Sequence, residues 1–497
     1  MPVLAEQLWG QAAALQRAGR AAEAILVYRQ FIALRPDVAE ARVNLGNLLS
    51  ATGAHGDAQV VYREALAMRR DLPEARFGLA NSLRAQGRLD EAVAAYRAVL
   101  ALNAANPGAL YNLGSTLQAL GDVDQAHTAF SRAVALKPDF AQAHNNLGIL
   151  HYDRAHWDEA LNCFSTALRL QPAFVKARNN QGMALHKLGR QTEAETAFTE
   201  AIRLAPDYVE AFDNLGALLL EMNRTEEAFA CFMRRAALVT VQGAAKPADS
   251  RKAHDAEQTV FRGRATTAVE IAGGARIAGP AINPRNTIAD ITEAWRTRQP
   301  QIVVIDDLLT PQALEGLRAF CHGSTIWRDT FDGYVGARPQ SGFACPLLAQ
   351  VAREFAQTYP DIFQDHPLLF AWAFKYQQGQ GGTRVHADFA AVNVNFWITP
   401  DDANLDPQKG GLVVWDKAAP LDWDFEHYNA GEAAIRDYLA KSGAIATRIP
   451  YRANRAVVFD SDLFHETDTL DFRPGYTNRR INVTLLYGTR DPSREPR

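Results

Sequence analysis

A 34-residue period runs through the first half of the chain. A small residue recurs at this interval, and an aromatic residue follows it four positions later in every copy. The small series is Ala24, Ala58, Ala92, Ala126, Ala160, Ala194 and Ala228, and the aromatic series is Tyr28, Tyr62, Tyr96, Phe130, Phe164, Phe198 and Phe232. Residues four apart on a helix lie on one face. The period therefore predicts pairs of amphipathic helices, none of which can bury its apolar face without its neighbours.

Two further series keep the same period. One is Leu45, Leu79, Leu113, Leu147, Gln181 and Leu215, mostly followed by glycine, and the other is Pro36, Pro138, Pro172 and Pro206. Proline cannot continue a helix, so the second series predicts where each second helix ends. Seven copies span about residues 5–242, and this pattern resembles the tetratricopeptide repeat (TPR) family. The resemblance implies an all-α solenoid over residues 1–242 that binds another polypeptide.

A column of carboxamides occupies one position on the first helix of the repeats. Its members are Asn44, Asn112, Asn146, Asn180 and Asn214, with Gly78 interrupting the series and Gly10 at its start. An amide offers both a donor and an acceptor, so the column can pair with an extended backbone of any sequence. The array resembles the TPR domain of the O-linked N-acetylglucosamine transferases, which implies that a protein or peptide is held on the concave face. The alternative is that the asparagines only help the helices to pack.

After Thr240 the helical period ends and the texture of the sequence changes. Residues 243–296 contain several prolines and Gly273-Gly274, and we interpret them as a connector with some local structure. Residues 297–497 contain short β-like runs separated by Gly, Pro, Asn and Asp clusters, together with a helix predicted from Thr310-Pro311 through Phe320. The β-like runs are 301–305, 371–376, 392–399, 411–415, 455–459 and 480–487. We therefore expect an α+β domain with a double-sheet jelly roll after the solenoid.

The decisive segment of this second domain contains His386-Ala387-Asp388. On a strand, alternation places the imidazole and the carboxylate on one face. Far downstream, His465 follows another β-like run in RAVVFDSDLFHETD. Two histidines and one carboxylate form the facial triad of non-haem Fe(II) oxygenases, which leaves coordination positions open. A His-x-Asp pair is weak alone, because a single strand histidine is more often a packed or solvated residue.

The C-terminal β-like run supplies a second constraint. In NRRINVTLLYG one face is apolar and the other is polar: the apolar face holds Ile481, Val483, Leu485 and Tyr487, and the polar face holds Arg480, Asn482 and Thr484. An arginine inside a barrel is costly unless an anion pairs with it. A dicarboxylate could satisfy it through a bidentate contact.

With these motifs, residues 297–490 resemble the 2-oxoglutarate/Fe(II)-dependent dioxygenases, particularly the prolyl-hydroxylase-like branch with its double-stranded β-helix. The resemblance implies that His386, Asp388 and His465 bind Fe(II) and that Arg480 binds the distal carboxylate of 2-oxoglutarate. It also implies that Tyr376, ten residues before the first ligand, lines the co-substrate pocket, and that Thr484 lies on the same inward face.

Some features depart from that family. The interval from His465 to Arg480 is longer than usual, which leaves Arg479 and Arg473 as rival partners of the co-substrate. Alternation favours Arg480, because Arg479 shares its face with the apolar residues. Asn393 and Asn395 replace the tyrosine often found on the strand after Asp388. We count Asn395 among the candidates for co-substrate binding, with hydrogen bonding within the sheet as the alternative for both.

Composition narrows the classes of partner. The net charge of -4 gives no electrostatic footprint for nucleic acid or for an anionic membrane. No run approaches 18 uninterrupted apolar residues, and Glu6 and Gln7 interrupt any N-terminal signal core. The four widely spaced cysteines lack a metal-ligand spacing and are expected to be reduced. We therefore expect a cytoplasmic location.

Three functions are compatible with these residues. The first is a 2-oxoglutarate- and Fe(II)-dependent oxygenase that hydroxylates a protein or peptide held by the repeats. The second is a non-catalytic TPR scaffold with a degenerate jelly-roll domain, although the complete set of ligands argues against it. The third is a cupin-like metalloenzyme that does not use 2-oxoglutarate, which would have no need of an inward Arg480.

Overall fold

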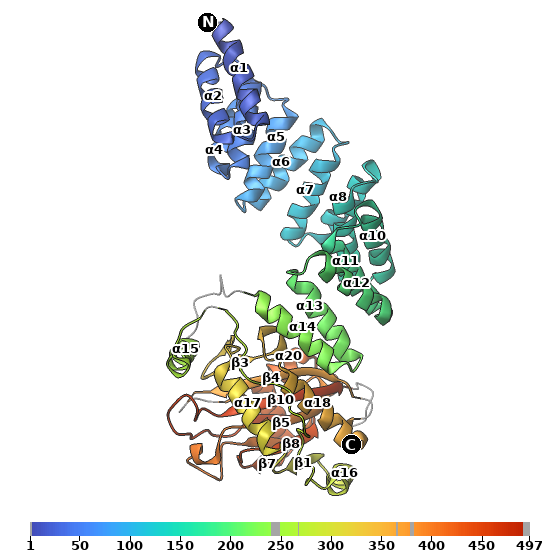
Figure 1. Cartoon of the computed structure of the whole chain (residues 1–497). Helices are drawn as coiled ribbons and strands as arrows, with labels where there is room; N and C mark the ends of the chain where they lie inside the picture. Colours follow the sequence, from blue (N-terminus) through green and yellow to red (C-terminus); the bar gives the residue numbers. More distant parts are fainter. Residues whose placement is uncertain (1, 240–248, 267, 364–365, 378–381, 491–497) are drawn as a thin grey trace. The chain divides into compact units, whose positions relative to one another are not determined.

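The computed structural model describes residues 2–239, 249–266, 268–363, 366–377 and 382–490 (Figure 1). The chain divides into two compact units, Met1–Glu200 and Ala201–Arg497. Repeated helices form the first unit and the start of the second, and a β-rich region with antiparallel sheets follows them.

Seven consecutive helix pairs form the repeats. Their bounds are α1 Pro2–Arg17, α2 Ala21–Leu34, α3 Ala39–Ala51, α4 His55–Met68, α5 Pro73–Ala85, α6 Leu89–Leu102, α7 Pro107–Ala119, α8 Val123–Leu136, α9 Ala141–Asp153, α10 Trp157–Leu170, α11 Val175–Lys187, α12 Gln191–Leu204, α13 Val209–Glu221 and α14 Thr225–Leu238. The predicted all-α solenoid over about 240 residues is confirmed.

The periodic residues form the core of each repeat. All seven alanines of the small series are 0% exposed, and the seven aromatic rings are at most 1% exposed. The glycines complete this packing: a Cβ on Gly148 would lie 2.6 Å from the ring of Phe164, and a Cβ on Gly182 would lie 2.6 Å from the ring of Phe198. Glycine is thus required at these positions, because the aromatic ring of the second helix packs directly on the backbone of the first helix.

The C-terminal region contains ten strands and several helices among the described residues. The strands are β1 Ile302–Ile305, β2 Asp329–Phe331, β3 Tyr334–Ala337, β4 Leu368–Tyr376, β5 Ala390–Trp397, β6 Leu412–Ala418, β7 Ala446–Ile449, β8 Ala456–Asp460, β9 Leu463–Thr467 and β10 Ile481–Thr489. The helices are α15 Asp249–Arg262, α16 Ile288–Thr297, α17 Pro311–Gly323, α18 Pro346–Thr358, α19 Pro360–Phe363, α20 Phe425–Asn429 and α21 Glu432–Lys441, with 3-10 turns η1 Pro339–Ser341 and η2 Asp401–Ala403.

The strands form two antiparallel sheets. The larger has the order β1-β8-β5-β10-β4-β3-β2, and the smaller has the order β7-β6-β9. Strand β10 lies centrally, with Thr484 opposite Asn395 of β5 on one side and opposite Trp372 of β4 on the other. The six β-like runs of the sequence correspond to β1, β4, β5, β6, β8 and β10. The predicted helix is α17, and the hydroxyl of Thr310 accepts a hydrogen bond from the amide of Ala313 at its start.

The seventh repeat belongs to the same compact unit as the sheets. Helix α14 packs against α18 and η1, and α13 contacts β4. Glu226 of α14 forms an ion pair with Arg353 of α18 at 2.7 Å, and Arg235 donates a hydrogen bond to the carbonyl of Gln340. The last helix pair therefore covers part of the β-rich region.

This covering predicts a difference between two fragments of the chain. Residues 201–497 are expected to unfold at a midpoint roughly 5–10 °C above that of residues 243–497, because the shorter fragment exposes the faces of α18 and β4 that α13 and α14 bury. Thermal unfolding and binding of a hydrophobic dye measure the difference. Equal midpoints with no extra dye binding would show that the seventh repeat adds nothing to the fold of the second unit.

The segment expected to be a connector is partly built into this unit. Residues 243–248 and 267 lie outside the described residues. Helix α15 packs on α17 and β3, and Glu257 on this helix makes a bidentate ion pair with Arg479, with both N–O distances at 2.8 Å. The amide of Gln258 donates to the hydroxyl of Tyr476 at 2.8 Å. The local structure expected here is thus a helix that contacts residues more than 200 positions away.

Lys375 of β4 is buried on the face of the strand that points away from Phe374 and Tyr376. Lys375 is 0% exposed, its Nζ lies 3.4 Å from Nδ1 of His322, and it sits 3.2 Å from the centre of the Tyr476 ring. Burial, and next the charge of Arg479, hold the pKa of Lys375 well below its usual value. Burial likewise lowers the pKa of His322 to about 3 and that of His254 to about 4. Near neutral pH the two histidines are therefore uncharged.

The buried histidines predict an acid-sensitive fold. The unfolded chain protonates His254 near pH 6.5, whereas the folded chain does so near pH 4, so this contribution to stability is complete above pH 6.5 and is lost as the pH falls towards 4. Replacing His254 by Phe should reduce the loss of unfolding free energy between pH 7.5 and 5 by up to about 2 kcal/mol. Urea denaturation at the two pH values measures it, with the exposed His156→Gln as the control. An unchanged pH dependence in His254→Phe would contradict the prediction.

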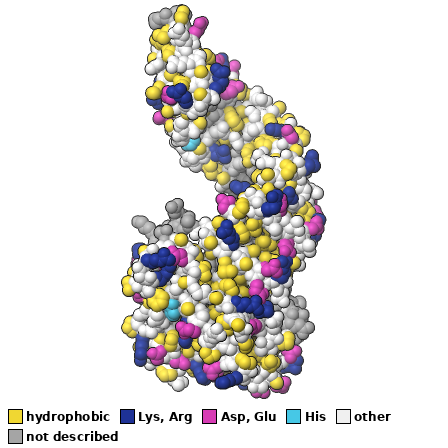
Figure 2. Space-filling view, viewed as in Figure 1, with side chains coloured by type: hydrophobic (Ala, Val, Ile, Leu, Met, Phe, Trp, Pro, Cys, Tyr) yellow, Lys and Arg dark blue, Asp and Glu magenta, His cyan; other side chains and the backbone are white. Residues whose placement is uncertain are grey.

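The structure also shows how the charged side chains and the four cysteines are distributed. Basic and acidic side chains are interspersed over the visible face (Figure 2). Cys321 and Cys345 are buried and Cys163 and Cys231 half-buried, and all four are free thiols. Among the described residues no helix combines the length and the apolar character that crossing a membrane requires.

Candidate metal centre

The three predicted metal ligands come together. Ligand atoms of His386, Asp388 and His465 all lie within 4.8 Å of one another. Nε2 of His386 is 3.8 Å from Oδ1 of Asp388, and Nε2 of His465 is 3.5 Å from Oδ2. His465 lies within β9 of the smaller sheet. We expected His386 and Asp388 on a regular strand. Instead they precede β5, and His386 forms only an isolated antiparallel bridge with His465. This bridge, rather than strand alternation, brings the two imidazoles together.

Backbone carbonyls orient both imidazole rings. Nδ1 of His386 lies 2.7 Å from the carbonyl oxygen of Arg384, and Nδ1 of His465 lies 3.1 Å from that of Leu463. A carbonyl only accepts, so each Nδ1 carries the proton and each Nε2 presents its lone pair towards Asp388. This is the usual arrangement around a metal-binding histidine.

The electrostatics of the site favour the metal-binding protonation states. Burial, and next the nearby His465, lower the pKa of His386 to about 4. Burial alone would raise the pKa of Asp388, but its contacts with the two histidines and the hydrogen bond from Asn393 lower it overall. A neutral imidazole and an ionised carboxylate are the forms that coordinate a cation.

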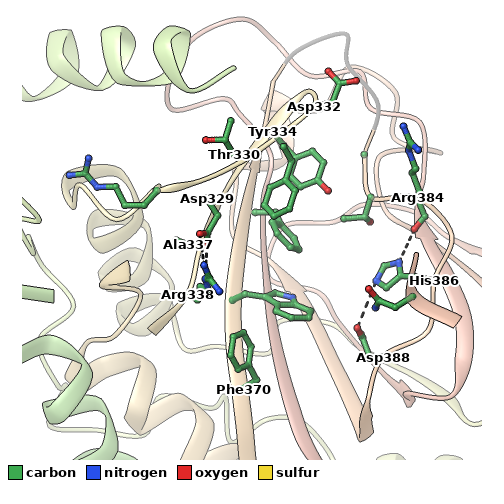
Figure 3. A pocket seen from close by; sticks show the side chains of 17 residues that line it. Asp329, Thr330, Asp332, Tyr334, Ala337, Arg338, Phe370, Arg384, His386 and Asp388 are labelled. Atoms are coloured by element: carbon green, nitrogen blue, oxygen red, sulfur yellow. Dashed lines mark hydrogen bonds and ion pairs between the residues drawn. The ribbon is translucent and has the colours of Figure 1, made fainter. Parts of the chain in front are cut away.

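A cavity of about 950 Å³ opens beside His386 and Asp388. Tyr334 and Phe370 stand across it from these two residues (Figure 3). Trp372 and Phe374, on the same face of β4 as Phe370, continue the aromatic wall, and Arg328, Arg338 and Arg384 lie at its edges. His386 and Asp388 therefore border a space that is large enough for part of a peptide.

Arg480 is a buried guanidinium with unused donors. It is 1% exposed, and its Nη2 donates to the carbonyl of Gly411 at 3.1 Å, whereas Nε and Nη1 have no hydrogen-bond partner among the described residues. Its guanidinium lies 4.8 Å from the ring centre of Tyr376 and 5.4 Å from that of Trp397. Burial lowers the pKa of Arg480, but a guanidinium stays charged. A buried guanidinium with unused donors would be stabilised by a bound anion.

The two rival arginines have other roles. Arg479 is engaged by Glu257, as described above. Arg473 is half-exposed and lies 3.8 Å from Asp402. Among the three candidates, Arg480 is the one that the fold leaves with buried, unpartnered donors.

Arg480 and the metal ligands line different cavities. Arg480 and Tyr376 line a smaller one of about 190 Å³, whereas His386 and Asp388 line the large one. The hydroxyl of Tyr376 contacts that of Thr467 at 3.2 Å, and Thr467 lies two residues from His465 on β9. Tyr376 thus links the arginine to the metal side. The smaller space equals the volume of roughly six water molecules, enough for a small organic acid.

The other predicted co-substrate residues form a buried polar chain. Asn393 donates to Oδ2 of Asp388 at 2.5 Å, and Asn395 donates to Asn393 at 2.6 Å. Thr484 and Asn482 both donate to Oδ1 of Asn395, at 2.8 and 2.7 Å. Asn395 and Thr484 therefore face the interior, and their hydrogen bonds run within the sheet to a metal ligand.

The asparagine column lies on the first helices of the repeats, as predicted, but part of it is used internally. All five side chains are half-buried. Asn44 donates to the hydroxyl of Tyr28 at 3.2 Å, Asn112 to Asn81 at 3.0 Å and Asn180 to Asn145 at 3.0 Å, and Asn146 accepts from Asn145 at 3.2 Å; Asn214 is also engaged. The packing role left open by the sequence is therefore real, and a peptide would meet mainly the carbonyl sides.

Several residues of the site were not predicted. The aromatic wall of Tyr334, Phe370, Trp372 and Phe374 and the hydroxyl of Thr467 carry no recognisable motif. Phe370, Trp372, Phe374 and Tyr376 alternate along β4, so a strand pattern with four aromatic residues on one face was the available signal.

Family models match the repeats. Tetratricopeptide-repeat models match residues 38–72, 80–121, 116–154 and 147–209. The helical part of this chain is thus built from tetratricopeptide repeats, which are modules of protein–protein interaction. No curated protein matches the chain significantly.

Two solved structures of repeat proteins are similar to part of the chain. YrrB, described as a TPR protein with an unusual peptide-binding site, is 24% identical, and the match covers 37% of this chain and 95% of YrrB with a TM-score of 0.33. A tetratricopeptide repeat protein from Parabacteroides merdae is 18% identical over 49% of this chain and 94% of its own, with a TM-score of 0.40.

Proposed function

We propose that the chain is a 2-oxoglutarate- and Fe(II)-dependent oxygenase that hydroxylates a protein or peptide presented by its repeats. The observation that carries the proposal is the convergence of His386, Asp388 and His465 beside a large cavity. The two antiparallel sheets, with His465 on the smaller one, support the further proposal that this region is a jelly-roll or double-stranded β-helix domain.

The donor set fits Fe(II). Two imidazole nitrogens and one carboxylate oxygen leave several positions of an octahedral ion open. The unpartnered Oδ1 of buried Asp388 is a group that a cation would satisfy. His386 and His465 would hold the ion through Nε2, since their Nδ1 atoms donate to carbonyls.

The interior also fits a dicarboxylate co-substrate. Nε and Nη1 of Arg480 would donate to the distal carboxylate, and the rings of Tyr376 and Trp397 hold the guanidinium flat. When bound, iron and 2-oxoglutarate supply O2 activation. One substrate molecule, one 2-oxoglutarate and one O2 would give the hydroxylated substrate, succinate and CO2. One atom of O2 would enter the new hydroxyl group and the other would enter succinate. The aromatic wall would exclude water and position the substrate.

The repeats support a polypeptide substrate. Tetratricopeptide arrays bind partners on extended surfaces, and the last repeat of this array packs directly on the β-rich region. The asparagine column would contribute its carbonyl oxygens to the backbone N–H groups of an extended peptide.

The test is iron-dependent turnover of 2-oxoglutarate in the full chain. Without substrate, each uncoupled turnover needs two electrons, which ascorbate supplies, and yields succinate, CO2 and water. We expect succinate formation that a chelator abolishes and added Fe(II) restores. Metal-dependent chemistry that ignores 2-oxoglutarate would favour the cupin-like alternative. A chain that binds no Fe(II), forms no succinate and still binds peptides would be a scaffold.

A further inference from the structure

The two oxygens of the Asp388 carboxylate have different surroundings. Oδ2 accepts a hydrogen bond from Nδ2 of Asn393 at 2.5 Å. Oδ1 is buried and has no hydrogen-bond partner among the described residues. The carboxylate is 1% exposed and Asn393 is 0% exposed, so water does not compete for this contact. One oxygen is therefore held within the protein, and the other is available.

The orientation of the Asn393 side-chain amide is fixed by a series of hydrogen bonds from β5 and β10. A carboxylate only accepts hydrogen bonds, so Asn393 turns its NH2 group towards Asp388 and its carbonyl towards Asn395. Asn395 donates to that carbonyl at 2.6 Å, and its own carbonyl accepts from Asn482 and Thr484 of β10. Every donor in this series points towards Asp388. The orientation of Asn393 is therefore determined over three residues of two strands.

We propose that Asn393 is a positioning residue that makes Asp388 bind the metal through Oδ1 alone; this rests on the proposed function. A bidentate carboxylate with two histidines would occupy four of six octahedral positions and leave two. With Oδ2 held by Asn393 the carboxylate occupies one, and three positions remain for a chelating co-substrate and O2. Outer partners of metal ligands typically contribute 10- to 100-fold to metal affinity or activity.

The test uses Co(II), whose visible absorption reports its coordination, on the full chain without 2-oxoglutarate. Asn393→Leu keeps the volume and removes the donor, and Asn393→Ser is a smaller change for use if the leucine variant does not fold. Asn482→Leu is the matched control, because it removes a buried carboxamide at the end of this hydrogen-bond series that lies farthest from Asp388. Thermal unfolding without metal reports the structural cost of each change.

We expect Asn393→Leu to bind Co(II) roughly 10- to 100-fold more weakly, with a changed visible spectrum. Asn482→Leu should bind within about threefold of the unaltered chain, at a similar cost in stability. Unchanged affinity and spectrum in both Asn393 variants would overturn the proposal, as would an equal loss in Asn482→Leu, which indicates a purely structural role. If the unaltered chain binds no Co(II) or Fe(II), the proposed function fails first and this inference falls with it.

Discussion

Replacing Asp388 by alanine is expected to abolish iron-dependent turnover and to weaken Fe(II) binding by at least about 100-fold. The carboxylate is the single anionic ligand of the site, and even outer partners of metal ligands contribute 10- to 100-fold. Anaerobic titration with Fe(II) and succinate formation from 2-oxoglutarate measure the two effects.

The same variant should change the stability of the metal-free fold only slightly. Buried Oδ1 has no partner among the described residues, which costs stability in the unaltered chain, whereas the variant deprives Asn393 of the acceptor Oδ2. We therefore expect the unfolding midpoint of metal-free Asp388→Ala to lie close to that of the unaltered chain. Metal should stabilise the unaltered chain only, raising its free energy of unfolding by about 2.7 kcal/mol at a metal concentration 100 times the Kd.

Asp402→Ala is the control for this experiment. Asp402 is exposed and its closest basic group is Arg473 at 3.8 Å, so its loss should leave metal affinity unchanged. Fe(II) affinity in Asp388→Ala equal to that of Asp402→Ala would show that the triad is not a metal site.

The solenoid was predictable because its signal repeats. Each small residue and each aromatic ring occurs in seven copies, and each copy meets the same neighbours, so one interpretation is checked seven times along the chain. The central strands were equally accessible, since β5 and β10 are eight and nine residues long and rich in β-branched and aromatic side chains. The unpredicted strands β2, β3, β7 and β9 have only three to five residues, too few for a period to stand out.

The site was only partly predictable, because its contacts join distant segments. Nothing local indicates that Glu257 engages Arg479, 222 positions away, and this pair is what leaves Arg480 as the unpaired arginine. The bridge between His386 and His465 is likewise a tertiary contact, so the sequence could name the candidate ligands but not the backbone geometry that joins them. Residue type indicated these candidates, and only the fold could show which of their atoms are satisfied.

Replacing Arg480 by methionine is expected to raise the KM for 2-oxoglutarate roughly 100-fold or more without weakening Fe(II) binding. Two charge-assisted hydrogen bonds from Nε and Nη1 would be lost, each contributing about 1.5–3 kcal/mol. Metal affinity should persist because Arg480 lines a cavity separate from the one that His386 and Asp388 line. Arg480→Lys keeps the charge but not the paired donors, so an intermediate KM is expected.

Arg479→Met is the matched control, because it removes a neighbouring arginine that lines the same small cavity but is already paired with Glu257. Arg479 loses its ion pair with Glu257, so the variant should lose roughly 1–3 kcal/mol of stability while its KM for 2-oxoglutarate stays within about threefold. Arg480→Met should show the reverse, since removing a buried and incompletely paired cation costs little in the absence of its anion. If Arg479→Met raises the KM and Arg480→Met does not, then Arg479 of the same small cavity binds the co-substrate, and the assignment of Arg480 is wrong.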